Sequence, residues 1–254
     1  MSFDLRQFGI SEMLRCGREV RAAAAAGDGC MELAAGAVVR YLYDAFRSAE
    51  DGTRQCVLAR FYKTHPYDLL EPDLQRFADA LLGAPPRDPG IKCLTLLATV
   101  GDEPDWCDRH RSRGHRAIPL ASEELVEQAP MIAQLFRGFG LDVRQVVRPG
   151  APLLHATGSR SFDVFHVAEA LGSPHIPAQS GFVEPYGVRS VVGFGGALRS
   201  GELFAVILFT RVPIPAHAAE RFRNIALDVK YALFNIGNDA VFLESGGAAP
   251  RGAR

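Results

Sequence analysis

Blocks of apolar positions with a helical period alternate along the chain with shorter, continuous apolar runs. In the helical blocks the apolar side chains fall on one face, as at Leu74 and Ala78, where Pro72 suits the first turn. Pro130 interrupts one of these blocks, and Asp28 is the expected N-terminal cap of another. The pattern predicts helices over residues 11–26, 28–47, 72–82, 122–138 and 216–234.

The continuous apolar runs are typical of β-strands. The run LFAVILFT at 203–210 is apolar at successive positions, so we expect it to be buried on both faces near the centre of a sheet. The segment 148–187 is rich in proline and glycine and predicts loops with one short strand. Strands are expected over residues 55–63, 91–100, 141–147, 162–167, 188–198 and 203–210.

The glycine cluster at Gly193, Gly195 and Gly196 raises the question of a phosphate-binding loop. A dinucleotide-binding fingerprint needs a further glycine at position 198, which is Leu198. A P-loop needs a lysine followed by serine or threonine, and no lysine lies nearby. The segment therefore predicts a β-hairpin whose glycines permit close approach of other groups or a bulge.

Composition and charge narrow the class of protein. The 254 residues are 48% hydrophobic and carry a formal net charge of −1, which gives no general attraction for nucleic acid or for an anionic membrane. The five scattered cysteines indicate a reducing compartment, and no apolar run is long enough to span a membrane. The start, MSFDLRQFGI, lacks the apolar core of a signal peptide, so we expect a cytoplasmic protein.

The order of elements after residue 173 resembles the C-terminal half of a GAF domain, the small-molecule sensor module of signalling proteins. A strand, a glycine-containing turn, a buried strand, a proline and a long helix follow one another in this half. The sequence Ile176-Pro177-Ala178-Gln179 and the later pair Val188-Arg189 are similar to phytochrome-type GAF domains. His175 replaces the family's aspartate, and the Cys-His chromophore attachment and the cyclic-nucleotide signature are absent.

This resemblance implies an α/β (α+β) fold with a central antiparallel sheet of about five or six strands. Helices are expected on one face and a ligand pocket under the loops of 150–187 on the other. The expected organisation is an N-terminal helical extension (1–27), a single GAF-like domain (28–244) and a disordered tail (245–254). The implied function is that of a sensory or regulatory domain of a bacterial signalling protein.

The resemblance also implies partners. GAF-like domains often pair through their first and last helices, here 11–47 and 215–236, so a homodimer is expected. The ligand state would pass through these helices to a histidine kinase or another signalling output module, in the same chain or in a partner chain. Neither nucleic acid nor a membrane is an expected partner.

Six side chains are candidates for ligand binding. His175 occupies the position where the related domains touch their ligand, and Tyr186 and Arg189 flank the entry to the hairpin strand. His166 shares a strand face with apolar residues, which is typical of a core histidine but also permits a haem ligand. The cofactor therefore stays open between haem and another small molecule. The candidates are His175, His166, Tyr186, Arg189, Trp106 and His115.

The segment CDRHRSRGHR at 107–116 allows three interpretations. Cys107, His110 and His115 are potential metal ligands, but a structural zinc site needs four ligands and the four arginines oppose a dication. The arginines suit a carboxylate or phosphate, with His115 as a further donor and Trp106 as a cover for a planar ligand. A solvated surface loop is the third interpretation.

No catalytic motif stands out in the sequence. A cysteine-dependent redox enzyme, similar to the GAF-fold reductases of free methionine sulfoxide, is an alternative function, with Cys93 and Cys107 as its candidates. Cys93 lies in an apolar run typical of a buried strand, whereas Cys107 lies among charges that favour a reactive thiol. A third alternative is a ligand-free dimerisation or interaction module.

Overall fold

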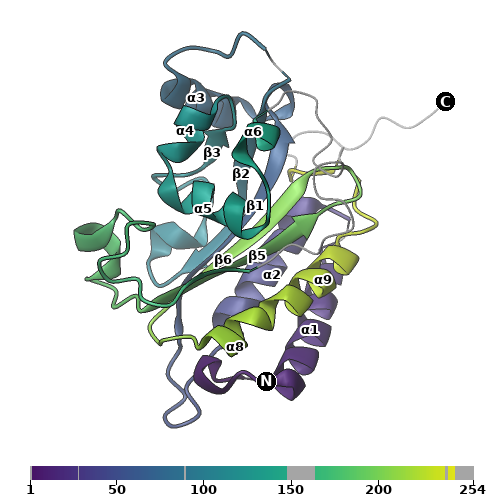
Figure 1. Ribbon diagram of the computed structural model, residues 1–254. Coiled ribbons are helices and arrows are strands. Elements are labelled where there is room, and N and C mark those ends of the chain that lie inside the picture. Colours follow the sequence, from purple (N-terminus) through teal and green to yellow (C-terminus); the bar gives the residue numbers. More distant parts are fainter. Residues whose placement is uncertain (1, 28, 89, 148–163, 238–239, 244–254) are drawn as a thin grey trace, which may run out of the picture.

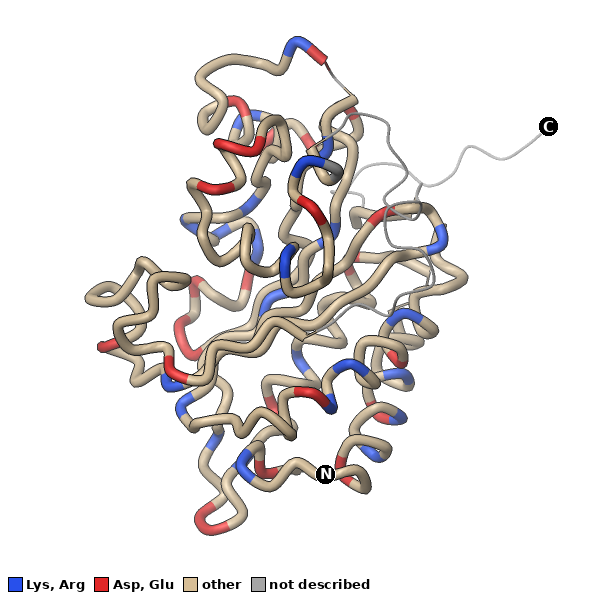
Figure 2. Tube along the Cα trace, in the orientation of Figure 1, with Lys and Arg blue, Asp and Glu red and all other residues tan. Residues whose placement is uncertain are grey.

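The structure is a computed structural model that describes residues 2–27, 29–88, 90–147, 164–237 and 240–243. The helix expected from residue 28 begins at Met31 with Cys30 at its N-cap position, so the expectation that Asp28 caps it is wrong. The expected tail 245–254 and much of the loop segment expected over the pocket lie outside the described residues. No helix among the described residues is long and apolar enough to cross a membrane. Figure 2 shows acidic and basic positions intermixed along the helices and loops.

A six-stranded antiparallel sheet forms the centre of the fold (Figure 1). Its order is β3-β2-β1-β6-β5-β4, so strands from the two halves of the chain meet at the β1–β6 pair. The strands are β1 (Cys56–Pro66), β2 (Lys92–Gly101), β3 (Ala117–Pro119), β4 (Phe165–Val167), β5 (Ser190–Ala197) and β6 (Leu203–Thr210). The predicted α+β class with an antiparallel sheet of five or six strands is confirmed.

Strand β6 is buried along its whole length, as its apolar run predicts. Its side chains alternate between two apolar cores, because successive residues of a strand point to opposite faces. Val206 and Leu208 contribute to the core beneath the long helices, and Ile207 and Phe209 contribute to the core on the other face. Strand β6 thus contributes side chains to the apolar cores on both faces of the sheet.

One face of the sheet is covered by the helices near the two ends of the chain. These are α1 (Ile10–Ala25), α2 (Met31–Ala45), α8 (Ala216–Glu220) and α9 (Phe222–Ala232), with the short η1 (Leu5–Gln7) beside them. Phe222 of α9 stacks on Phe8, with ring centroids 5.4 Å apart, and lies 5.2 Å from Phe194 of the sheet. Aromatic packing therefore joins the terminal helices to the central strands.

The other face is covered by helices as well as loops, which corrects the expectation of helices on one face only. The covering elements are α4 (Glu123–Glu127), α5 (Pro130–Gly138), α6 (Val143–Val146) and the π-helical turn η4 (Gln179–Val183). Ile132 and Phe136 of α5 are buried against the sheet. Helix α3 (Pro72–Leu82) packs beside β3, and η2 (Tyr67–Leu69) and η3 (Pro104–Cys107) are short turns.

One prediction of local structure is wrong, and one short strand has no counterpart in the predictions. Residues 141–147 contain helix α6 instead of a strand, because Asp142 caps the turn by accepting a hydrogen bond from the backbone of Arg144. Its apolar residues Val143 and Val146 are then three positions apart and both buried. Strand β3 was not predicted, since three residues carry too little pattern to identify.

The predicted hairpin of β5 and β6 is present, and its glycines make room for side chains of the covering helix. A Cβ atom at Gly193 would lie 2.9 Å from Leu135 Cδ1, and one at Gly195 would lie 2.9 Å from the ring of Phe139. Gly201 takes a left-handed conformation in the turn (φ 83°). The glycines therefore serve close packing and the turn, in agreement with the hairpin interpretation.

Candidate functional site

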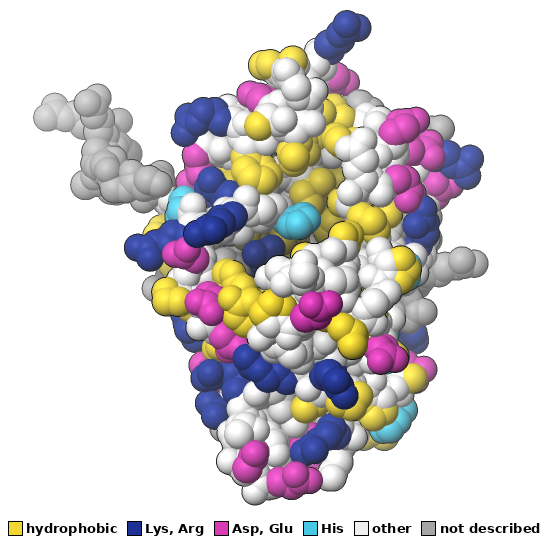
Figure 3. Space-filling view, turned by 90° about the vertical axis from the view of Figure 1, so that its left-hand side faces the viewer, with side chains coloured by type: hydrophobic (Ala, Val, Ile, Leu, Met, Phe, Trp, Pro, Cys, Tyr) yellow, Lys and Arg dark blue, Asp and Glu magenta, His cyan; other side chains and the backbone are white. Residues whose placement is uncertain are grey.

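A cavity of about 570 Å³ lies on the sheet face opposite α1, α2 and α9. It is bounded by β1 and β6, by the junction of α4 and α5, and by the loops that follow β2 and β4. Figure 3 shows a hollow with hydrophobic side chains at its floor and a histidine and basic side chains around it. Its volume suits a small organic molecule.

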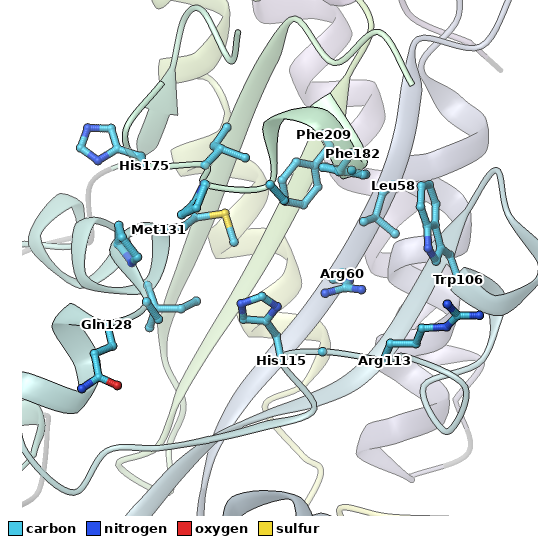
Figure 4. Close-up of a pocket in the computed structure, with 18 residues that line it drawn as sticks. Leu58, Arg60, Trp106, Arg113, His115, Gln128, Met131, His175, Phe182 and Phe209 are labelled. Atoms are coloured by element: carbon cyan, nitrogen blue, oxygen red, sulfur yellow. The ribbon is translucent and has the colours of Figure 1, made fainter. Parts of the chain in front are cut away.

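The cavity has a largely apolar wall. Leu58 of β1 and Phe209 of β6 project from the sheet, and Met131 projects from the start of α5 (Figure 4). Ile132 of α5 also lines the cavity. Because β1 and β6 are paired, Leu58 and Phe209 are register partners and form one continuous apolar surface. This part of the cavity would bind the apolar part of a ligand.

An aromatic group closes one end of the cavity. Trp106 of η3 lies 4.6 Å from the ring of Tyr186 and 5.5 Å from that of Phe182. The hydroxyl of Tyr186 donates a 3.1 Å hydrogen bond to Glu103, and burial together with this bond raises the pKa of Tyr186. Trp106 is therefore held by its neighbours, and it lines the cavity.

Arg60 brings a positive charge onto the same face of β1. Its Nη1 lies 3.3 Å from the hydroxyl of Tyr62 and its Nη2 lies 3.2 Å from the hydroxyl of Ser112. Its Nε is buried without a hydrogen-bond partner, and no ion pair joins Arg60 to a carboxylate among the described residues. In Figure 4 the guanidinium lies between His115 and Trp106.

His115 lies at the mouth of the cavity in an unusual backbone conformation. Its φ of 59° is the only positive value of a non-glycine residue in the described part of the chain. The protein around the imidazole, and then the charge of Arg60, lower the pKa of His115 below its ordinary value. The lowered pKa favours the neutral imidazole, which can either donate or accept a hydrogen bond.

The loop that carries His115 is fixed by ion pairs. Arg109 is buried and binds Glu32 through Nε (2.6 Å) and Nη2 (2.9 Å), and its Nη1 lies 2.8 Å from Glu71. Arg116 pairs with Asp73 on α3. Two of the four arginines in 107–116 are thus structural, so the segment is not a freely solvated loop.

The remaining charges of the cavity are also basic. Arg113 lines it from an exposed position and lies 3.7 Å from Asp105, and His175 lines the end opposite Trp106. The eighteen lining residues include two arginines and two histidines and neither aspartate nor glutamate. The cavity therefore combines an apolar wall with ionisable side chains of the basic types only.

The sequence Ile176-Pro177-Ala178-Gln179 positions the end of the cavity near His175. The side chain of Gln179 donates hydrogen bonds to the carbonyls of Ala170 (3.1 Å) and Ile176 (2.7 Å) and accepts one from the backbone of Gly172 (2.8 Å). These bonds close the loop on itself, while Ile176, Pro177 and Ala178 face the cavity.

Two candidate residues lie away from the cavity. Phe165 and Val167 belong to the core on the cavity side of the sheet, whereas Val164 packs against the core on the other side. Because side chains alternate along a strand, His166 lies on the face of Val164, away from the cavity. Burial lowers the pKa of His166, and its Nε2 is buried without a partner. Arg189 is exposed at the start of β5 and does not line the cavity.

The potential metal ligands of 107–116 do not converge. The sulfur of Cys107 lies 3.3 Å from the carbonyl of Gly101, while His110 faces Asp73 at 3.8 Å. Among the described residues, no three His, Cys, Asp or Glu side chains are placed to hold a metal ion. Cys93 is fully buried, and burial raises the pKa of its thiol to about 12, which opposes a nucleophilic role.

The structure brings Trp106, His115 and His175 together around one cavity, with Tyr186 supporting Trp106. Arg60, which also lines the cavity, is not among the residues expected from the sequence. The signal was present in CVLARFYK, where strand alternation puts a charged side chain on the same face as Leu58 and Tyr62. Comparison with known proteins found no matching family model and no matching curated protein.

Proposed function

We propose that this chain is a sensory or regulatory domain that binds a small organic molecule in the cavity described above. The observation that carries the proposal is the cavity itself. It is concave, of ligand size, mostly apolar, and contains a few convergent polar groups that can orient a bound molecule. Arg60 and His115 are the polar groups nearest its centre in Figure 4.

The position of the cavity supports transmission of the ligand state to the terminal helices. Phe209 of β6 lines the cavity, and its neighbour Leu208 packs into the core under α1, α2 and α9. A ligand that favours one position of this strand over another would shift the arrangement of those helices. We propose a histidine kinase or another signalling module, in this chain or a partner, as the receiver.

Exposed apolar side chains on the terminal helices support a homodimer as part of this proposal. Ile10 and Leu14 of α1, and Leu227 and Tyr231 of α9, are exposed by between 43% and 65%. Because α1 and α9 pack against each other, a second copy could cover these side chains. Sedimentation equilibrium at about 10 µM tests this: a dimer is expected, and a monomer would contradict it.

The ligand-binding proposal is tested with the fluorescence of Trp106, the single tryptophan of the chain. Titration with the neutral apolar probe 1-N-phenylnaphthylamine is expected to quench its emission through energy transfer in the cavity. Ala178→Phe places a bulky ring at the cavity wall and should weaken binding about tenfold or more.

Ala84→Phe makes the same change at an exposed position outside the cavity and should leave the probe affinity unchanged. Saturable quenching that is lost in Ala178→Phe and kept in Ala84→Phe supports the proposal. Absence of saturable binding to the unaltered protein, or equal binding to both variants, would contradict it.

A further inference from the structure

We infer that the ligand of this cavity is an amphipathic monoanion, with a flat apolar body and one carboxylate that binds Arg60. The inference rests on the proposed function, since it names the chemical class of molecule that the cavity holds.

Arg60 lies in the interior of the sheet. It belongs to β1, between β2 and β6, and its register partners are Thr99 and Ile207. Its side chain is half-buried on a face that otherwise carries Leu58 and other apolar groups. A guanidinium is always charged, and taking it out of water is unfavourable unless an anion or several hydrogen bonds compensate the charge.

The protein compensates this charge only in part. The groups within hydrogen-bond distance of the guanidinium are neutral hydroxyls, those of Tyr62 and Ser112, and the Nε–H donor has no acceptor. By contrast, the buried guanidinium of Arg109 is paired with two carboxylates. This difference indicates that the charge of Arg60 is available to an anion that does not belong to the chain.

The nearby carboxylates are engaged elsewhere. Glu103 accepts the hydrogen bond of Tyr186, and Asp105 faces Arg111 and Arg113 at 3.9 and 3.7 Å. No carboxylate occurs among the residues that line the cavity. Glu103 and Asp105 line an adjoining pocket that also contains Arg60. Because Tyr186 and Arg113 already engage these two carboxylates, a bound anion would meet mainly the attraction of Arg60.

The surroundings of Arg60 define the rest of the ligand. His115 lies beside the guanidinium, and the N–H of its imidazole can donate a further hydrogen bond to a carboxylate. Trp106 on one side and the apolar pair Leu58 and Phe209 above it suit a flat hydrophobic body. The half-buried guanidinium of Arg60 balances one negative charge, and the second arginine of the cavity, Arg113, is exposed and lies near Asp105. This arrangement favours a carboxylate over a dianionic phosphate monoester.

The experiment compares 2-naphthoate with 2-naphthamide, which share a flat body and differ in charge. Affinities are measured by calorimetry and by Trp106 emission. The carboxylate is expected to bind at least about tenfold more tightly, as is typical of a charge-assisted hydrogen bond. Arg60→Met should abolish the preference while retaining the binding of neutral 1-N-phenylnaphthylamine, which verifies an intact cavity.

Two further variants separate charge from shape. Arg60→Lys keeps the charge without the guanidinium fork and should retain part of the preference. Arg76→Met removes an exposed arginine of α3 and should leave both affinities unchanged. If Arg60→Met does not fold, the intermediate preference of Arg60→Lys still tests the role of this side chain.

The outcomes distinguish this inference from the proposed function. Equal affinities for naphthoate and naphthamide, with the neutral probe still bound, would overturn the anionic ligand and leave the small-molecule cavity intact. Tighter binding of 2-naphthyl phosphate than of naphthoate would overturn the carboxylate assignment. Failure of the neutral probe to bind would contradict the proposed function itself.

Discussion

The guanidinium of Arg60, on the central strand β1, lies close enough to the imidazole of His115 to lower its pKa. The two residues are 55 positions apart in the sequence, and the loop that carries His115 is brought to the strand by the ion pairs of Arg109 and Arg116. Their proximity places one permanent and one titratable cationic group at the same point of the cavity.

This relationship predicts that anion binding depends on pH. A bound carboxylate offsets the charge of Arg60, so the pKa of His115 should be higher in the complex than in the free protein. The complex then takes up a proton, and the affinity for 2-naphthoate should rise about threefold or more as pH falls from about 7.5 to 5.5. The carboxylate stays ionised in this range.

Calorimetry in buffers of different ionisation enthalpy measures the proton uptake directly. His115→Asn should bind naphthoate with an affinity that does not change over the same range. His110→Asn, an exposed control in the same loop, should behave as the unaltered protein. Proton release on binding, or an unchanged pH profile in His115→Asn, would show that another group titrates.

The left-handed backbone at His115 predicts that replacing this residue by glycine stabilises the fold but weakens ligand binding. A residue with a Cβ atom is disfavoured at φ 59° by about 1–2 kcal/mol, whereas glycine is not, although glycine loses more entropy on folding. His115→Gly should therefore raise the free energy of unfolding by about 0.5–1 kcal/mol while weakening naphthoate binding. Urea denaturation measures the first effect.

Gly201→Ala provides the opposite comparison, since it introduces a Cβ atom at φ 83° in the hairpin turn. It should lower the free energy of unfolding by about 1 kcal/mol. A loss of stability in His115→Gly would mean that the imidazole contributes packing that outweighs the backbone strain.

The two glycines of β5 are expected to differ in their tolerance of alanine. At Gly195 a Cβ atom would overlap the carbonyl oxygen of Phe204, which is part of the neighbouring strand and cannot move freely. At Gly193 the close atoms belong to the side chains of Leu135 and Phe165, which can shift.

We expect Gly195→Ala to lower the free energy of unfolding by about 3 kcal/mol and Gly193→Ala by about 1 kcal/mol. Thermal and urea denaturation of the two variants would measure the difference. Equal losses would show that strand β5 relaxes as easily as the side chains of α5.

Buried His65 predicts a loss of stability in mild acid. Its Nδ1 lies 3.4 Å from Lys63 Nζ and its Nε2 lies 3.3 Å from the carbonyl of Leu69, an arrangement that suits the neutral ring. Burial, and then the charge of Lys63, lower the pKa of His65 to about 4.

The unfolded chain protonates His65 near pH 6.5, whereas the folded protein does so only near pH 4. The free energy of unfolding should therefore fall as pH decreases through this interval, by roughly 3 kcal/mol from His65, and level off below it. Urea denaturation at several pH values should show a shallower fall in His65→Gln. Exposed His217→Gln should keep the full fall.

The amino-acid sequence by itself determined the main elements of the fold. Apolar runs identified β2, β5 and β6, because strands buried on both faces have no polar alternation. The β-branched and aromatic residues of 55–63 identified β1, although Arg60 and Lys63 interrupt its apolar positions. The helical period identified α3 and α9, and the absence of phosphate-loop residues identified the glycine segment as a hairpin. The short elements β3 and α6 could not be identified, since three or four residues carry too little pattern. In α6 the capping residue Asp142 decides that the segment is a helix.

Only the tertiary structure decided which charged side chains belong to the cavity. In the sequence, Arg109, Arg113 and Arg116 are equivalent members of one basic segment, but the fold pairs Arg109 and Arg116 with carboxylates of α2, α3 and the turn before it. Arg60 lies in the sequence between apolar residues of a strand, with no other candidate residue near it. Its role depends on which groups the other strands and loops place around its guanidinium, and these lie far away along the chain.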